Sequence, residues 1–368
     1  MRYDDASAWC REVVSGGHVM LFDPDMFHSE LTKASKQFDI PYESLHSFLR
    51  NVHLIHIKRT HHWVRSQLFV EQPHYLQAYT TTGTSTTATT ATQEGDTRRS
   101  ILEMARHLNH PPYMMARLVV EHMVCNTTTT TTTGPSKKFV TEAMRDPMNK
   151  LGTLEAIDPQ YHSSQSFPSN TIKQPSVVKV DAFSGRPVPL PSQPVTRLAT
   201  EVMEAIDSDP MYGPRQDRER HFVGLEHELM LEQSLRAMEI PFETETELRI
   251  RGTPRTPDIL FSCPVGIRVP KRNENTFEWK VVCWIDSKAL FGDVHTHRTS
   301  VLPQAETYVH RFGPGLVLYW FGHAPIERLG DGHGDVVIAG WNVPTCFMLP
   351  TGELASHGTT NSTVSFDG

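Results

Sequence analysis

The sequence predicts an α/β fold for its C-terminal part, behind an all-helical N-terminal part. Residues 279–286 form a mostly apolar, β-branched run that is typical of a buried strand, and residues 315–321 form another after a Gly-Pro-Gly turn. A strand is also expected at 258–262. Apolar residues recur at the helical period from Leu225 to Met238, which indicates a helix packed on the sheet.

The N-terminal part is expected to be helical over residues 7–125. Residues 101–108 and 113–123 are predicted as two helices joined by a short Asn-His-Pro-Pro turn, which resembles a helix-turn-helix. The second helix of such a unit can enter the major groove of DNA. The same unit also serves for packing or protein docking, and Met115 and Leu118 have the character of core residues.

Low-complexity tracts suggest the domain organisation. Residues 80–92 are almost all Thr, Ser, Ala and Gly, and residues 127–133 are an unbroken Thr run. Neither tract can bury a core, so both are expected to be flexible insertions. We therefore expect a helical domain over 1–148, a Pro/Ser/Gln-rich linker over 149–195, an α/β domain over 196–350 and a flexible tail over 351–368.

Composition narrows the class of protein. The chain has 368 residues, a net charge of −7 and a mean hydropathy of −0.38. It contains no apolar run long enough to span a membrane and no apolar signal-peptide core at its beginning. Its five cysteines are scattered, which favours reduced thiols over a disulfide framework. Because the net charge is negative, any binding of nucleic acid must come from local basic patches and bridging metal ions.

Two short motifs carry the candidate chemistry. Thr-Pro-Asp ends at Asp258, and Asp-Ser-Lys spans 286–288 at the end of the predicted strand. Residues i and i+2 of a strand share a face, so Asp286 and Lys288 would enter one site, and a β-hairpin would bring Asp258 beside them. Two carboxylates that hold Mg²⁺, with a lysine nearby, suit attack of water on a phosphodiester. The alternative is an ordinary turn and an ordinary surface pair.

Other residues are weaker candidates. Glu226 and Glu228 lie on the predicted helix about 200° apart, so only one is expected to face the site. Lys58 and Arg59 belong to a basic, His-rich segment that either contacts phosphate or is a solvated helix face. Residues 293–297 hold an Asp and two His that either line the mouth of the site or form a surface loop, which is the favoured interpretation.

The motifs together resemble the codanin-interacting nuclease family, in the TPD-motif branch of the PD-(D/E)xK superfamily of restriction-endonuclease-like nucleases. The resemblance rests on Asp-Pro-Met-Tyr-Gly-Pro at 209–214, Gly-Leu-Glu-His-Glu at 224–228, Thr-Pro-Asp at 256–258, Trp-Ile-Asp-Ser-Lys-Ala-Leu-Phe-Gly-Asp at 284–293 and Arg-Phe-Gly-Pro-Gly-Leu-Val at 311–317. Segments 56–61, 112–118 and 144–147 join it in the N-terminal part.

The resemblance implies an αβββαβ nuclease core, a location in the nucleus with the cytoplasm as a second one, and a codanin-like protein partner. It implies that Mg²⁺ or Mn²⁺ is held by Asp258, Asp286, the Ser287 carbonyl and one of the two helix glutamates. The pair Gln304 and Tyr308, of the form Q-x-x-x-Y, would line the path of DNA or RNA. The alternative function is a nuclease-like scaffold that docks its partner through the N-terminal helices.

Overall fold

The computed structural model describes residues 3–71, 100–127, 137–155, 197–270, 276–330 and 334–356. The chain forms two compact units that interleave along the sequence. The first, called here the sheet unit, comprises Met1–Gly16, His28–His56 and Gln216–Gly368, and the second, the helical unit, comprises Gly17–Phe27 and Ile57–Arg215. The predicted α/β class with a helical N-terminal region is confirmed.

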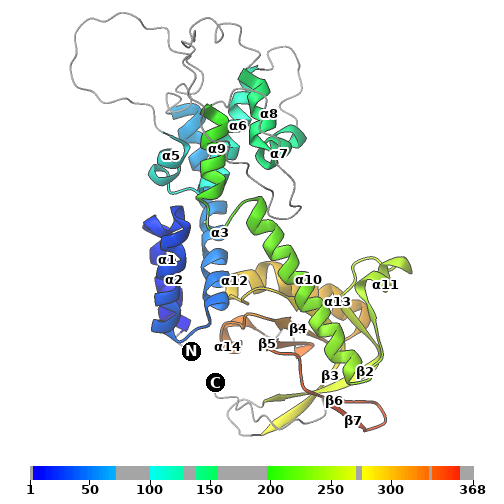
Figure 1. Ribbon diagram of the computed structural model, residues 1–368. Coiled ribbons are helices and arrows are strands. Elements are labelled where there is room, and N and C mark those ends of the chain that lie inside the picture. The colour runs from blue at the N-terminus through cyan, green and yellow to red at the C-terminus, as the bar shows by residue number, and fades with distance from the viewer. Residues whose placement is uncertain are drawn as a thin grey trace, which may run out of the picture. The chain divides into compact units, whose positions relative to one another are not determined.

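The sheet unit is built on a mixed sheet of seven strands (Figure 1). The strands are β1 (Phe242–Thr244), β2 (Ile259–Pro270), β3 (Phe277–Lys288), β4 (Gly315–Tyr319), β5 (Val336–Gly340), β6 (Cys346–Met348) and β7 (Leu354–Ser356). β2 and β3 pair antiparallel, as the sequence predicted. β4 and β5 continue the sheet in parallel beyond β3, while β6, β7 and β1 pair antiparallel on the side of β2.

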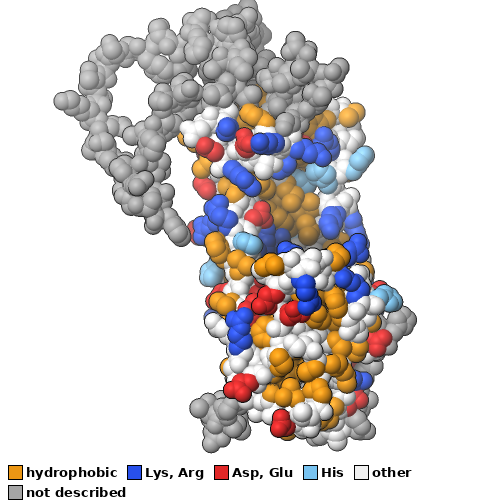
Figure 2. Space-filling model, turned by 90° about the vertical axis from the view of Figure 1, so that its right-hand side faces the viewer, with side chains coloured by type: hydrophobic (Ala, Val, Ile, Leu, Met, Phe, Trp, Pro, Cys, Tyr) orange, Lys and Arg blue, Asp and Glu red, His pale blue; other side chains and the backbone are white. Residues whose placement is uncertain are grey.

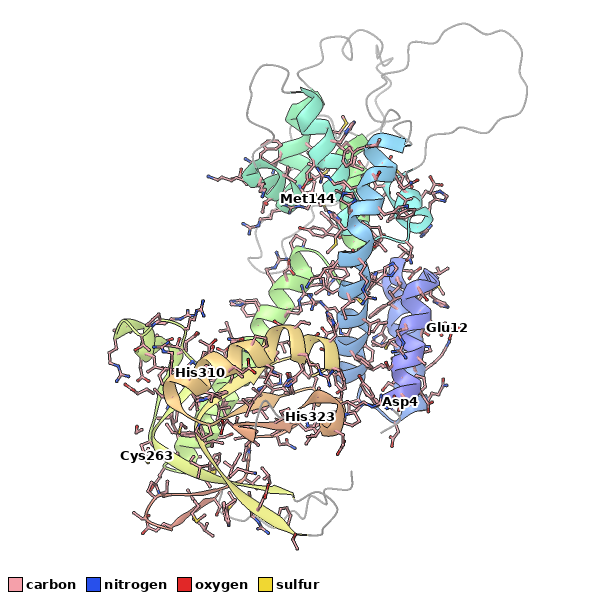
Figure 3. The ribbon with its side chains drawn as sticks, turned by 180° about the vertical axis from the view of Figure 1, so that it is seen from behind. Asp4, Glu12, Met144, Cys263, His310 and His323 are labelled. Carbon is pink, nitrogen blue, oxygen red and sulfur yellow. The ribbon has the colours of Figure 1, made fainter. Side chains whose placement is uncertain are left out.

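Helices cover the sheet on both faces. The helices of this unit are α1 (Tyr3–Ser15), α10 (Pro214–Ala237), α11 (Glu245–Ile250), α12 (Val294–Thr296), α13 (Leu302–Phe312) and α14 (Ile326–Leu329). Leu231 and Leu235 of α10 share one core with Ile285, whereas Ala305 of α13 shares the other core with Trp284. Successive residues of β3 thus point to opposite layers, as the pleat requires. Figures 1 and 3 show α10 and α13 on opposite sides of the strands.

The N-terminal helices also contribute to the sheet unit. Two long helices, α2 (Pro24–Phe38) and α3 (Tyr42–Ser66), run through both units. The rings of Phe48 in α3, Tyr3 in α1 and Phe291 beyond β3 pack together, with the Phe48 centroid 5.3 Å from that of Tyr3 and 5.0 Å from that of Phe291. This aromatic cluster fixes the segment that leaves the candidate site.

The helical unit contains η1 (Val19–Phe22), the turn Gln67–Glu71, α5 (Ile101–His107), α6 (Pro112–Thr127), α7 (Lys137–Arg145), α8 (Pro147–Glu155) and α9 (Arg197–Asp207). Ser100 and Glu103 form a capping box at the start of α5. Asp209 accepts hydrogen bonds from the backbone N–H groups of Tyr113, Met211 and Tyr212. The Asp-Pro-Met-Tyr segment is therefore a structural corner that holds the start of α6.

Most predicted elements are present. The helices expected at 101–108 and 113–123 are α5 and α6, and the strand expected at 258–262 runs on to Pro270 through a register irregularity between Leu260 and Val265. The Thr tract at 80–92, all but the first residue of the tract at 127–133, and linker residues 156–195 lie outside the described residues. The tail prediction was wrong for Leu354–Ser356, which adds a strand to β6. Across the described ranges, no helix combines the length and apolar character needed to cross a membrane.

Candidate active site

The candidate site lies where β2 begins and β3 ends. Asp258 directly precedes β2, and Asp286 and Lys288 are among the last residues of β3. Because Ile259 pairs with Ile285 in the antiparallel register, the start of β2 lies beside the end of β3. The backbone N–H of Ser287 donates to Oδ2 of Asp258 at 2.6 Å. Nζ of Lys288 lies 2.7 Å from Oδ2 of Asp286. The structure thus brings the two motifs together at one end of the hairpin.

The charges of this site are held away from water. The residue Asp286 is 1% exposed and the Lys288 side chain 17%. Burial raises the pKa of Asp258, and the nearby charge of Asp286 raises it further. Burial also raises the pKa of Asp286, and the neighbouring Lys288 offsets only part of that rise. Each carboxyl group is therefore costly to ionise without an added positive charge.

The donor set fits a hard divalent cation. Oδ2 of Asp286 is buried and lies 2.7 Å from the ammonium group of Lys288, whose charge also acts on Asp258. Carboxylate oxygens are the ligands that Mg²⁺ and Mn²⁺ prefer. Within the ranges that the structure describes, no three His, Cys, Asp or Glu side chains are already arranged as a metal-binding cluster. The fit therefore rests on the two neighbouring carboxylates, which have a single lysine between them.

A chain of hydrogen bonds runs from the lysine to the Thr-Pro-Asp turn. Nζ of Lys288 donates to Oε1 of Gln304 at 3.3 Å, and Nε2 of Gln304 donates to the hydroxyl of Tyr308 at 2.6 Å. That hydroxyl donates to the carbonyl oxygen of Thr256 at 3.0 Å. The Q-x-x-x-Y pair on α13 therefore connects Lys288 to the turn before Asp258, and Tyr308 is buried.

The structure distinguishes the two glutamates of α10. Glu228 is half-buried, and burial followed by the charge of Glu245 raises its pKa. It lines a small pocket together with Asp258 and Glu245. Glu226 is exposed, on another side of the helix. Glu228 is therefore the helix acid that faces the site.

Glu245 is a site residue that the sequence analysis missed. It begins α11, its charge raises the pKa of Asp286, and its carboxylate accepts a hydrogen bond from the Thr256 hydroxyl at 3.3 Å. Its backbone N–H donates to the carbonyl oxygen of Asp258 at 2.9 Å. The Thr-Glu-Thr-Glu sequence at 244–247, a capping box, marks the helix start and was the available signal.

The remaining candidates lie elsewhere. Lys58 and Arg59 are exposed on α3, in the part of it that belongs to the helical unit. The expectation of a surface loop at 293–297 was wrong for Asp293 and His297, which are buried. Asp293 caps α12, and Nδ1 of His297 lies 2.8 Å from the hydroxyl of Tyr319. His295 is exposed.

Comparison with known proteins places the chain among relatives. Residues 194–339 match the family described as a protein of unknown function with a TPD sequence motif. "CDAN1-interacting nuclease 1" of Danio rerio is 41% identical over 34% of this chain and 38% of its own length. The proteins of the same name from Bos taurus and Homo sapiens are each 28% identical, over 73% of this chain and 71% of their own length.

No solved structure matches the chain. The alignments to the bovine and human relatives extend beyond the TPD region, in agreement with the motifs found in the N-terminal part. The comparisons confirm the resemblance that the motifs predicted: this chain is similar to the CDAN1-interacting nuclease 1 proteins and matches the TPD sequence-motif family.

Proposed function

We propose that this chain is a divalent-metal-dependent nuclease that hydrolyses phosphodiester bonds of nucleic acid. The observation that carries the proposal is the carboxylate pair, half-buried Asp258 and buried Asp286, whose charge is balanced among the described residues by Lys288. A fold that needed only stability would not hold two desolvated acids together at this cost. The relatives are named nucleases, which supports the same class of reaction.

Asp258 and Asp286 are the proposed ligands of Mg²⁺ or Mn²⁺. Glu228 of α10 and the carbonyl oxygen of Ser287 are the further ligands we propose, because Glu228 shares a pocket with Asp258 and the Ser287 backbone adjoins it. When bound, the ion would supply positive charge against the phosphate and lower the pKa of a water molecule.

Lys288 contributes a fixed positive charge. Burial lowers its pKa, but the carboxylate of Asp286 outweighs this and the net shift is upward. A lysine that stays protonated at neutral pH cannot accept a proton from water. Its role is therefore to donate hydrogen bonds to the phosphate as negative charge develops there.

Gln304 and Tyr308 hold this geometry. Their hydrogen bonds join the Lys288 ammonium group to the Thr256 carbonyl, and so fix the lysine relative to the turn that presents Asp258. Positioning of this kind matters because small displacements of a reacting group lower the rate steeply.

The test is cleavage of labelled single-stranded, duplex and branched DNA and RNA, with Mg²⁺, with Mn²⁺ or with EDTA. Wild type should cut at least one substrate only when metal is present. Asp286→Asn and Lys288→Ala should reduce the rate by at least about a hundredfold. Glu226→Gln is the matched control, since it changes an exposed acid on the helix that carries Glu228, and it should leave the rate unchanged.

Absence of metal-dependent cutting by well-folded wild type, on every substrate, would contradict the nuclease proposal. A second function would then gain weight. The relatives are named for an interaction with CDAN1, and we propose a related protein partner for this chain, docked through the N-terminal helices. Capture of a codanin-like protein that is unaffected by Asp286→Asn would support that scaffold function.

A further inference from the structure

A second hollow adjoins the carboxylate pair. Its volume is about 450 Å³, which is within the range of ligand pockets, and its lining includes Glu245, Arg249, Arg255, Thr256, Gln304 and Tyr308. Gln304 and Tyr308 belong to the hydrogen-bond chain that begins at Lys288. Glu245 also lines the small pocket that contains Asp258 and Glu228. The hollow therefore shares Glu245 with the small pocket at the proposed reaction centre and shares Gln304 and Tyr308 with the chain from Lys288.

The charges of the hollow leave one cation without a partner. Nη2 of Arg249 lies 2.6 Å from Oε1 of Glu245, so these two residues neutralise each other. Among the residues described by the structure, no acidic side chain pairs with Arg255, which is exposed. Figure 2 looks onto the side where Figure 1 draws α11, and acidic and basic side chains adjoin one another there. Arg255 thus gives the hollow its net positive character.

The backbone at Arg255 is held in an unusual conformation. Its φ is 50°, in the left-handed region that residues with a Cβ rarely adopt. The guanidinium of Arg311 donates to the carbonyl oxygens of Pro254 and, at 3.0 Å, of Arg255. This accounts for Arg311 in the Arg-Phe-Gly-Pro-Gly motif. On the other side of Arg255, the Tyr308 hydroxyl donates a hydrogen bond to the carbonyl oxygen of Thr256. The turn that carries Arg255 is therefore held by hydrogen bonds before and after that residue.

The same turn contains a second left-handed position for comparison. Gly252 has φ of 81°, and nothing lies within 4 Å of where its Cβ would be. Glycine thus occupies one left-handed position of the turn, where no side chain is needed. Arginine occupies the other, where glycine would be less strained. Strained residues of this kind cluster at functional sites. An arginine that keeps this strained conformation beside the hollow is therefore a candidate binding residue.

We propose that this hollow binds a second phosphate of the nucleic-acid strand, beside the one that is cut, and that Arg255 is its principal cation. The inference rests on the proposed nuclease function and adds a substrate contact to it. An arginine fork matches the oxygens of a phosphate. A contact to the phosphate would be independent of base sequence and sensitive to salt.

The test measures binding rather than cleavage. A short fluorescein-labelled single-stranded DNA and its RNA counterpart are titrated by anisotropy in Ca²⁺ buffer over a series of salt concentrations. Arg255→Gly removes the cation and relieves the left-handed backbone, so its melting temperature should equal or exceed that of wild type. Its affinity should fall severalfold, and the slope of log Kd against log salt should fall by about 0.7, the value for one lost single-strand phosphate contact.

Two further variants serve as references. Arg255→Lys should keep most of the salt dependence of wild type, because the positive charge is retained. It should keep only part of the affinity, because lysine lacks the two-pronged guanidinium group that matches two phosphate oxygens. Arg268→Ala removes an exposed arginine on β2 that lies over the ring of Phe277, and it should bind like wild type. Failure of wild type to bind either strand, or an Arg255→Gly slope equal to that of wild type, would overturn the subsite.

A linkage scan separates this proposal from the nuclease function. Oligonucleotides with a single neutral methylphosphonate at successive positions should show one position that weakens wild type but has no further effect on Arg255→Gly. If cleavage fails but this coupling is found, the subsite stands and the nuclease function does not. If cleavage occurs and no position couples to Arg255, the subsite is wrong.

Discussion

Two buried aspartates at opposite ends of one short segment have opposite surroundings. Asp293 is 4% exposed and accepts hydrogen bonds from the Asn51 side chain at 2.8 Å and from the backbone N–H groups of His295 and Thr296. Asp286 is 1% exposed, its Oδ2 lies 2.7 Å from Nζ of Lys288, and the charge of Asp286 acts on a second carboxylate, Asp258. One acid is held by several neutral donors, and the other shares one lysine with another acid.

The difference separates a structural acid from a functional one. A buried carboxylate with several donors stabilises the elements that donate, in this case α12 and α3. A buried carboxylate that shares a single lysine with a second carboxylate weakens the fold until a further cation joins the pair. Burial of an acid alone would not have distinguished the two residues, but their hydrogen-bond partners do.

The largest expected effect is on stability, at the satisfied acid. Asp293→Ala leaves backbone N–H groups of α12 and one amide proton of Asn51 without their acceptor, and should lower the free energy of unfolding by about 3 kcal/mol. Asp286→Asn in metal-free protein should lower it by far less or raise it, because the repulsion between the two carboxylates is removed while Asp258 remains to balance the charge of Lys288. Urea denaturation of both variants measures the two changes in the free energy of unfolding. Equal destabilisation by the two substitutions would contradict the distinction between a structural and a functional acid.

The next effect is the pH dependence of the metal-free protein. Folding raises the pKa of Asp258 above its ordinary value of 3.8, so the folded state binds more protons than the unfolded state, and this residue makes stability fall as the pH rises from that value towards neutrality. Asp258→Asn should remove that contribution. The free energy of unfolding of the metal-free variant should therefore rise relative to that of wild type by more than about 1 kcal/mol between acid and neutral pH. Melting temperatures over the pH range, with and without Mg²⁺, check it.

Added Mg²⁺ provides the internal control for this prediction. The ion should stabilise wild type more at neutral pH than at acid pH, because deprotonated carboxylates bind it. It should stabilise Asp258→Asn little at either pH. If Mg²⁺ did not change the melting temperature of wild type, the assignment of a metal to this carboxylate pair would be wrong.

The sequence alone predicted the position of Asp286, beside another acid, and not that of Asp293, among hydrogen-bond donors. Asp286 and Lys288 share a strand face through local periodicity, and Asp258 follows from the hairpin, so a short stretch of sequence suffices. Asp293 was expected on a surface loop, because its partner Asn51 is 242 residues away in the sequence. No local pattern indicates that contact, since it exists only once α3 packs against the end of β3.

A smaller effect is expected at Tyr308. Tyr308→Phe removes the hydroxyl that connects Gln304 to the Thr256 carbonyl, while the ring keeps its edge-on contact with Trp284. We expect a loss of about 1 kcal/mol of stability and a fall in kcat of roughly fivefold, with KM little changed. His310→Ala, at an exposed position two residues later on α13, is the control. A large rise in KM with unchanged kcat would instead make Tyr308 a substrate contact.

The helix acid shows where sequence reasoning stopped. Glu226 and Glu228 both suit the motif, and their choice depends on the rotation of α10 about its axis, which its packing on the sheet determines. Leu231 and Leu235 in the core fix that rotation and leave Leu225 and Leu229 exposed. The exposed leucines weaken the amphipathic pattern, so the sequence did not reveal the phase. Glu245 was missed for a similar reason, since β1 must pair with β2 before α11 reaches the site.

The smallest expected effect compares the two glutamates directly. Glu228→Gln should weaken Mg²⁺ binding severalfold without abolishing it, because Asp258 and Asp286 remain and a peripheral acid contributes less than either. Glu226→Gln should leave Mg²⁺ binding unchanged. Isothermal titration with each variant measures the difference. If both glutamates contributed equally, α10 would have to turn on the sheet when the metal binds, and the buried positions of Leu231 and Leu235 argue against that motion.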